Sequence, residues 1–168
     1  MAVTCNGSAS VKLGWNFLDS RTDGSQTRNA DSLSSKISYT GSAIDNVVTK
    51  KYTIAASGTQ GIDLAGSLTD PAGNTITWTK LMGLIIILDD ETTATSISVG
   101  PYSGSNPLAG LFADASDLLK IYNGGSMCWM TPAATPVTVT GGSADALRIV
   151  NNDASNAATV YVAFLGKA

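Results

Sequence analysis

Short stretches in which apolar and polar residues alternate recur along the whole chain, separated by turns rich in glycine, proline and asparagine. The first has Val11, Leu13, Trp15 and Phe17 at every second position, a pattern typical of a strand with one covered face. Helical periodicity lasts no more than two turns, and its best case, residues 108–121, predicts one short helix or a helical turn in a loop. We therefore expect an all-β protein, an antiparallel β-sandwich of the jelly-roll type.

The alternation and the turn residues also place the later strands. They are expected at residues 36–40, 47–56, 59–64, 76–88, 95–99, 118–122, 127–131, 137–140, 147–151 and 158–165. Residues 70–74 (Asp-Pro-Ala-Gly-Asn) predict a tight turn with glycine at positive φ. Residues 123–125 and 141–142 predict hairpin connections, and residues 151–156 a polar tip.

The segment from Leu81 to Leu88 is apolar throughout and too short to span a bilayer, which takes about 20 helical residues. It predicts a strand covered on both faces, and residues 157–166 are similarly apolar. One face of each would fill the core, and we expect a second subunit to cover the other. Loops or a short helix of the same chain could cover it instead. The residues assigned to the subunit interface are Leu81, Leu84, Ile85, Ile86, Ile87, Leu88, Val160, Val162 and Phe164.

A chain of 168 residues is long enough for one domain with its own core, with or without an N-terminal extension. Residues 19–35 are polar apart from Leu33 and Ala30 and predict a long loop or arm. We expect residues 1–46 to form an N-terminal strand and this arm, packed on the main domain. Residues 47–168 then form the sandwich.

The charge distribution excludes some partners. The chain has 10 basic and 13 acidic residues and no lysine or arginine cluster, so neither nucleic acid nor a membrane is expected to bind it. Only 14% of residues are charged, against about 25% in typical domains, which suits a protein that lies against neighbours. The N-terminus has no charged segment followed by an apolar one, so no secretory signal is expected.

The chain contains no histidine, which removes Ser-His-Asp triads, Cys-His dyads and histidine-based zinc sites. Asp89, Asp90 and Glu91 form one acidic cluster, which reads as a solvated strand end rather than a catalytic carboxylate pair. A calcium-loop reading from Asp19 fails because the twelfth position is Ala30, although another kind of calcium site between loops stays open. We expect no enzyme activity, cofactor or metal.

Structural roles are expected for the tryptophans and cysteines. Trp15, Trp78 and Trp129 lie in alternating patterns beside apolar residues, so packing is expected rather than ligand stacking. Cys5 and Cys128 are far apart and in no paired motif, and we expect two unpaired thiols in a reducing compartment.

Three long segments share an order of strands and turns with known proteins. They are "KYTIAASGTQGIDLAGSLTDPAGNTITWTKLMGLIII", "ISVGPYSGSNPLAGLFADASDLLKIYNGGSMCWMTP" and "VTVTGGSADALRIVNNDASNAATVYVAFLGKA". From about Lys51 onward the chain resembles a family of small virion structural proteins of tailed bacteriophages and prophages. The likeness covers about two thirds of the chain and includes no catalytic residue. Gly61 departs from the family pattern, which suggests a β-bulge.

The resemblance implies a β-sandwich on the capsid or tail of a virion, and capsid cement proteins of this type are commonly trimers. We therefore expect a non-enzymatic capsid cement or decoration protein that forms a homotrimer and binds the major capsid protein. It would be located at the capsid surface of the virion and assembled in the cytoplasm of the bacterial host. A tail, baseplate or fibre component is one alternative. A carbohydrate-binding module that uses the tryptophans and loop aspartates is another.

Overall fold

The computed structural model describes residues 5–20, 26–70, 73–89, 91, 93–102 and 106–168. In this part of the chain strands dominate, and the helical element is a single 3-10 turn. The strands are β1 (Cys5–Ser20), β2 (Gln26–Ile44), β3 (Asn46–Ile54), β4 (Thr59–Asp63), β5 (Lys80–Leu88), β6 (Ser96–Pro101), β7 (Leu119–Tyr122), β8 (Ser126–Met130), β9 (Val137–Thr138), β10 (Ala146–Asn151) and β11 (Ala158–Lys167), and the 3-10 turn is η1 (Ala109–Leu111).

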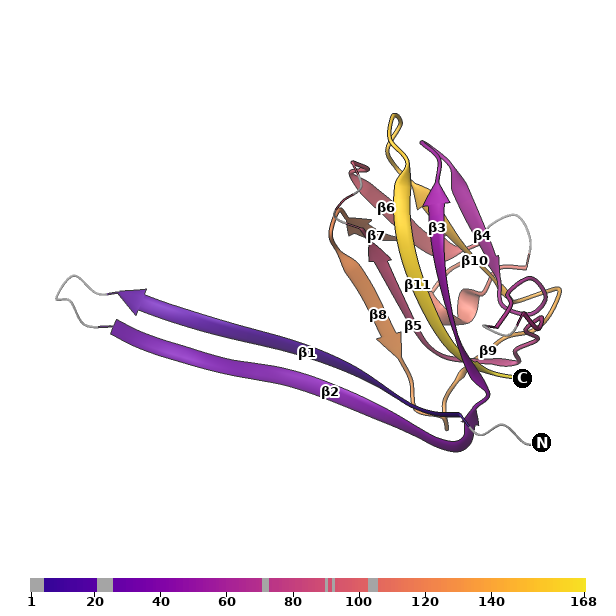
Figure 1. Cartoon of the computed structure of the whole chain (residues 1–168), viewed down its shortest axis with the longest axis horizontal. Coiled ribbons are helices and arrows are strands. Elements are labelled where there is room, and N and C mark those ends of the chain that lie inside the picture. Colours follow the sequence, from indigo (N-terminus) through magenta and orange to yellow (C-terminus); the bar gives the residue numbers. More distant parts are fainter. Residues whose placement is uncertain (1–4, 21–25, 71–72, 90, 92, 103–105) are drawn as a thin grey trace.

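Two antiparallel sheets pack face to face to form the sandwich (Figure 1). One has the order β4-β10-β6-β7, and the other has the order β3-β11-β5-β8 with β9 also paired to β5. The prediction of an all-β antiparallel sandwich is confirmed. Within the described residues no helix is long and apolar enough to cross a membrane.

The strand pairs are nested along the chain, which is the jelly-roll arrangement. β3 pairs with β11, β4 with β10, β5 with β8, and β6 with β7. The chain thus folds back on itself as one long antiparallel hairpin, and this hairpin rolls up when β11 pairs with β5 and β10 with β6.

The nested order corrects one turn prediction. Residues 123–125 were expected to join hairpin partners, but β7 and β8 lie in different sheets. The hairpin turn expected at residues 141–142 is confirmed locally, because Thr140 and Ala144 on either side of it form an antiparallel bridge, although β9 and β10 lie in different sheets. Both are nevertheless tight turns: Gly124 and Gly142 have φ of +70° and +74°, which favours glycine. They cross from one sheet to the other. The turn at residues 70–74 agrees with its prediction where it is described, because Gly73 has φ of +87°.

A two-stranded ribbon, made of β1 and β2, extends away from the sandwich (Figure 1). Its register runs without interruption from Gly7 opposite Tyr39 to Ser20 opposite Gln26. The expectation of a loop over residues 19–35 is therefore wrong for residues 19–20, which end β1, and for residues 26–35, which pair with β1, while residues 21–25 lie outside the described part. Polar residues can form strands here because a face of a two-stranded ribbon can remain open to water, which suits polar side chains. At about 3.4 Å per residue, the 16 residues of β1 make a ribbon about 50 Å long.

The core between the sheets is filled by alternate residues of facing strands. Its fully buried side chains include Ile62, Leu64, Leu81, Leu84, Ile86, Leu88, Ile97, Val99, Leu147, Ile149, Val160 and Phe164. Trp78 closes one end of this core, with 2% of its surface exposed. Its indole Nε1 donates a hydrogen bond of 2.7 Å to Asn46 Oδ1, which satisfies the polar atom of an otherwise buried ring.

Gly61 does not form the expected bulge. It pairs with Arg148 in continuous register between Gln60 and Ile62. A Cβ atom at position 61 would lie 3.0 Å from the ring of Tyr102, so glycine here makes room for that ring. The departure from the family pattern is a packing feature rather than a change of register.

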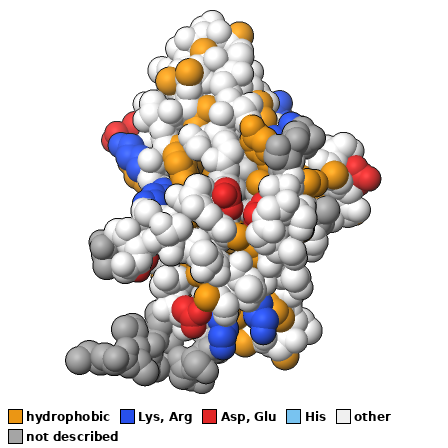
Figure 2. Space-filling view, turned by 90° about the vertical axis from the view of Figure 1, so that its right-hand side faces the viewer, with side chains coloured by type: hydrophobic (Ala, Val, Ile, Leu, Met, Phe, Trp, Pro, Cys, Tyr) orange, Lys and Arg blue, Asp and Glu red, His pale blue; other side chains and the backbone are white. Residues whose placement is uncertain are grey.

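The surface carries few charges. On the side of the sandwich shown in Figure 2, uncharged polar side chains and backbone predominate, and the charged side chains are scattered. This agrees with the low charged fraction of the sequence.

The packing of Trp78 on the backbone of β11 gives a stability test. A Cβ atom at position 166 would lie 2.2 Å from an indole carbon, and the ring is too tightly held to move away. We expect Gly166→Ala to lower the free energy of unfolding by about 2 kcal/mol, as overpacking does in other cores. Urea denaturation measures it. Gly141→Ala is the control, because its Cβ would meet Ala65 at an ordinary 3.6 Å; equal losses in both variants would contradict the prediction.

Candidate assembly surface

The outer face of the five-stranded sheet is organised in rows across its strands. Residues opposite each other on paired strands share a face, so the register defines each row. The lower row contains Val47, Leu165, Gly83 and Met130; the middle row contains Thr49, Ala163, Ile85 and Cys128; the upper row contains Lys51, Tyr161, Ile87 and Ser126. These residues point away from the core, and what covers them decides the role of this face.

The lower row is covered by the base of the ribbon. Tyr39 and Ile44 are each 1% exposed and form a small second core with Met82 and Leu165, against which Val47 also packs. The Tyr39 hydroxyl lies 2.8 Å from the carbonyl oxygen of Thr131 and 3.1 Å from that of Met82, so its proton can be donated to either. The ribbon is thereby anchored on the sheet at this end.

A bulge in β5 supplies part of this second core. Leu165 pairs with Gly83, but the next residue of β11, Gly166, pairs with Leu81, so Met82 is an extra residue on β5. Met82 is 1% exposed and joins the cluster around Tyr39. The first half of the apolar segment 81–88 is thus covered on both faces, as predicted. The cover on the outer side is the chain's own ribbon.

The structure corrects most of the predicted interface residues. Seven of them fill the core of a single chain at 0–3% exposure, because they lie on the inner faces of β5 and β11: Leu81, Leu84, Ile86, Leu88, Val160, Val162 and Phe164. Of these seven, Val162 also lines the outer groove described below. Ile87 faces outward at 41% exposure, and Ile85, one row below, is half-buried. The sequence pattern alone did not reveal which residues of a fully apolar strand face inward.

The middle and upper rows form an open, shallow groove of about 370 Å³. It is lined by Thr49, Lys50, Lys51, Ile85, Ile87, Tyr161, Val162 and Ala163. The charged residues of this lining are lysines, and Lys51 Nζ lies 5.3 Å from the centre of the Tyr161 ring, within cation–π range. Tyr161 was not among the predicted interface residues, although its alternation with Val160 and Val162 could have indicated it. The groove is apolar at its floor and basic at one edge.

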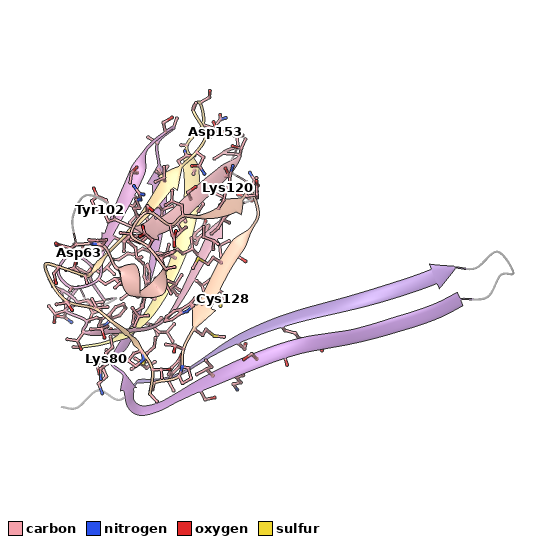
Figure 3. The ribbon with its side chains drawn as sticks, turned by 180° about the vertical axis from the view of Figure 1, so that it is seen from behind. Asp63, Lys80, Tyr102, Lys120, Cys128 and Asp153 are labelled. Atoms are coloured by element: carbon pink, nitrogen blue, oxygen red, sulfur yellow. The ribbon has the colours of Figure 1, made fainter. Side chains whose placement is uncertain are left out.

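Cys128 is at the end of the middle row, on the side of the sandwich from which the ribbon leaves (Figure 3). It is a free cysteine, as expected. Burial raises the pKa of the Cys128 thiol. The pKa of the Tyr39 hydroxyl is also raised, mainly by burial and to a lesser extent by the nearby Cys128. Both groups stay neutral at pH 7. Of Cys5 the structure describes the backbone, within β1.

The two faces of the ribbon differ at its base, where side chains are described. By register the odd-numbered positions share one face, on which Tyr39 is buried and Ile37 half-buried. The even-numbered positions share the other face, on which Lys36 and Ser38 are exposed.

Polar loop residues at the far end of the sandwich form a structural network. The Asp153 carboxylate accepts hydrogen bonds from the backbone N–H groups of Thr95, Ser155 and Asn156. These bonds, led by those of Ser155 and Asn156, hold its pKa below the ordinary value of 3.8. Asn151 donates to three carbonyl oxygens of the neighbouring loops. These hydrogen bonds link three loops of the sandwich to one another. The label of Asp153 in Figure 3 shows where they lie.

The other residues considered for metal binding, catalysis or ligand stacking have structural roles as well. In the described residues, no group of three or more carboxylates or cysteines lies close enough together to hold a metal ion. Asp89 follows β5 and accepts a hydrogen bond from the Glu91 backbone, as a turn residue does, while Asp90 lies outside the described part. Trp78 is buried, Trp129 packs against the core, and the side chain of Trp15 lies outside the described part.

Comparisons with known proteins identify no family for this chain. No protein-family model matches the chain, and no curated protein matches it. A solved structure described as "Bacillus endospore appendages form a novel family of disulfide-linked pili" matches 73% of this chain and 87% of its own, with 15% sequence identity and a TM-score of 0.39. A likeness at this level carries no argument about function.

The anchoring of the ribbon by Tyr39 is testable. Tyr39→Phe removes the buried hydroxyl that donates to the carbonyl oxygen of Thr131 or Met82, of which Met82 keeps the N–H of Thr131 as a donor. The loss should lower the free energy of unfolding by about 1–2 kcal/mol. It should also speed amide exchange at the base of β2. Urea denaturation and hydrogen exchange measure the two effects. Tyr161→Phe, at a 41% exposed tyrosine, should stay within about 0.5 kcal/mol of the unaltered chain; a comparable loss there would refute the anchoring role.

The loop network predicts a pH dependence. The pKa of Asp153 is lowered in the folded state, so the charged carboxylate stabilises the fold above its ordinary pKa of 3.8. That contribution is lost as the pH falls through the folded-state pKa. Asp153→Asn should therefore be less stable than the unaltered chain at pH 7, with the difference shrinking below pH 3.8. Urea midpoints across this range measure it, with the exposed Glu91→Gln as control. A difference independent of pH would contradict the assignment.

Proposed function

We propose that the chain is a non-enzymatic structural protein of a bacteriophage virion, a capsid cement or decoration protein that forms a trimer and binds the major capsid protein. The observation that carries the proposal is the ribbon of β1 and β2, which extends about 50 Å from the sandwich (Figure 1). A two-stranded hairpin alone is marginally stable in water. A ribbon that extends this far from the sandwich is therefore suited to contact another molecule along its length.

The resemblance to virion proteins supports the setting. It begins near Lys51, so it covers the sandwich from the middle of β3 to β11 and leaves the ribbon out. The part of the chain that carries the resemblance is thus the jelly roll, and the ribbon lies outside it. A protein that fits a common scaffold to a particular shell would place its specific contacts outside that scaffold.

The sandwich contributes a second contact surface. The groove above the base of the ribbon exposes Ile87 and Tyr161 beside the half-buried Ile85. Multiple weak contacts of this kind, repeated in every subunit of a shell, stabilise it through multivalency rather than through one tight site. Cement function needs surfaces of this kind and no reacting group.

Binding to empty capsids tests the proposal. The purified chain should sediment with capsids of the phage or prophage that encodes it, saturably, and should raise the temperature at which the shells open. Its solution mass should be that of three chains of 17.2 kDa. Capsids of an unrelated phage are the control. Absence of capsid binding, or density for the chain in the tail by cryo-microscopy of the virion, would contradict the capsid role, the latter in favour of a tail component.

A further inference from the structure

We infer that a pocket at one end of the four-stranded sheet binds a neutral sugar, as a single sugar unit of a glycan. The pocket has a volume of about 230 Å³, and its lining includes Gly61, Asp63, Ser67, Tyr102, Asn106 and Asp145. It shares no lining residue with the groove on the five-stranded sheet. The inference goes beyond the proposed virion role and does not depend on it.

Three segments meet at this pocket because their backbones are joined to Ala146, the first residue of β10. Ala146 pairs with Asp63 at the end of β4. Its carbonyl oxygen accepts the N–H of Tyr102, which follows β6, at 3.0 Å, and its own N–H donates to the carbonyl oxygen of Asn106 at 2.9 Å. Residues 103–105 lie outside the described part and are not included in the site. Figure 3 shows Asp63 and Tyr102 on the side of the sandwich away from the ribbon.

Two aspartates of the lining are each held through one of their two carboxylate oxygens. Asp145 is 3% exposed, and its Oδ2 accepts the N–H of Gly142 at 2.6 Å. Asp63 Oδ1 accepts the N–H of Ala65 at 2.8 Å. Among the described residues, neither carboxylate forms an ion pair and no hydrogen bond reaches its second oxygen. Because a buried carboxylate is costly without hydrogen-bond donors, these second oxygens are where hydroxyl groups of a ligand would bind.

Tyr102 and Asn106 add an apolar wall and a further polar group. The Tyr102 ring lies against β4, because Gly61 has no side chain to hold it away. The Tyr102 hydroxyl and the Asn106 side-chain amide form no hydrogen bond within the described residues. A sugar ring presents C–H bonds on its face and hydroxyl groups at its edge. An aromatic ring beside unpaired hydrogen-bonding groups suits both.

The lining disfavours the other classes of small ligand. Its described residues include no lysine or arginine, so a phosphate or carboxylate group would meet two carboxylates without compensation. A purely apolar ligand would leave those carboxylates without donors. A metal ion is disfavoured because no group of three acidic or cysteine side chains lies close together in the described residues. The volume is below the roughly 300–1,000 Å³ of sites for drug-sized ligands and therefore suits one sugar ring.

Titration of the ¹⁵N-labelled full chain with the methyl glycosides of glucose, galactose, mannose and N-acetylglucosamine tests the site. At least one of the four should shift the amide signals of residues 61–67, 102 and 145–146 saturably, with a dissociation constant on the order of 1 mM. Methylammonium chloride is titrated in parallel. Absence of saturable shifts with all four glycosides, or shifts confined to other residues, would overturn the inference. Saturable pocket shifts with methylammonium alone would overturn it in favour of a cation site.

Two pocket variants have matched controls in the same chain. Asp63→Asn keeps an oxygen for the N–H two residues on but removes the charge. Its control is Asp114→Asn, because Asp114 accepts the N–H two residues on at the same 2.8 Å. Tyr102→Ala removes the aromatic wall, and its control is Tyr122→Ala, at an exposed tyrosine at the opposite end of β6. Each pocket variant should weaken glycoside binding about tenfold and each control should leave it unchanged; equal effects within a pair would overturn the inference.

Asn106→Gly separates binding from folding. Asn106 has a φ of +50°, a conformation that glycine adopts freely, so the variant loses the side-chain amide without backbone strain. Its urea midpoint should match that of the unaltered chain while glycoside binding falls severalfold. Binding as tight as that of the unaltered chain would overturn the assignment of this pocket. Glycoside binding without sedimentation on capsids would refute the capsid role and support the sugar site, and the reverse result would refute the sugar site alone.

Discussion

The packing of Tyr39 on the lower end of β5 and β11 determines how the rest of the molecule is arranged. Side chains of a strand alternate between two faces, so fixing one residue of the ribbon fixes the facing of every other residue in register with it. Tyr39 is buried against the sheet, with its hydroxyl between the carbonyl oxygens of Thr131 and Met82. At the base of the ribbon, Ile37 and Tyr39 are therefore turned toward the sheet, whereas Lys36 and Ser38 are exposed. A slip by one residue would instead place Lys36 and Ser38 on the apolar sheet.

This contact also resolves an apparent conflict in β5. The strand is apolar at every position from 81 to 88, although a sandwich strand has one face in the core and one outside. Leu84, Ile86 and Leu88 fill the core, and the bulge places Met82 under the ribbon. Ile87 remains with 41% of its surface exposed. The chain thus covers the lower half of its own apolar strand and leaves the upper half open to solvent.

The sequence predicted strands and turns well and failed where pairing over long distances decides the outcome. The strand positions and the jelly-roll class followed from alternation and from glycine-rich turns. The turn at residues 123–125 was assigned to a hairpin because local sequence cannot tell whether the next strand joins the same sheet or the opposite one. Residues 26–35 read as a loop because their polar composition lacks strand signals. Their pairing is imposed by β1, whose partner the sequence does not name.

The same limit explains the predicted interface. Along residues 81–88, apolar residues on both faces removed the alternation that normally identifies the inner face, so core and surface residues were assigned together. The register of β5 with β8 and β11 restores the distinction, since Ile85 and Ile87 share rows with Cys128 and Ser126 rather than with core residues. A single chain covers most of its apolar strand surface by itself. The part that it leaves open is confined to the middle and upper rows of one sheet, around Ile85, Ile87 and Tyr161.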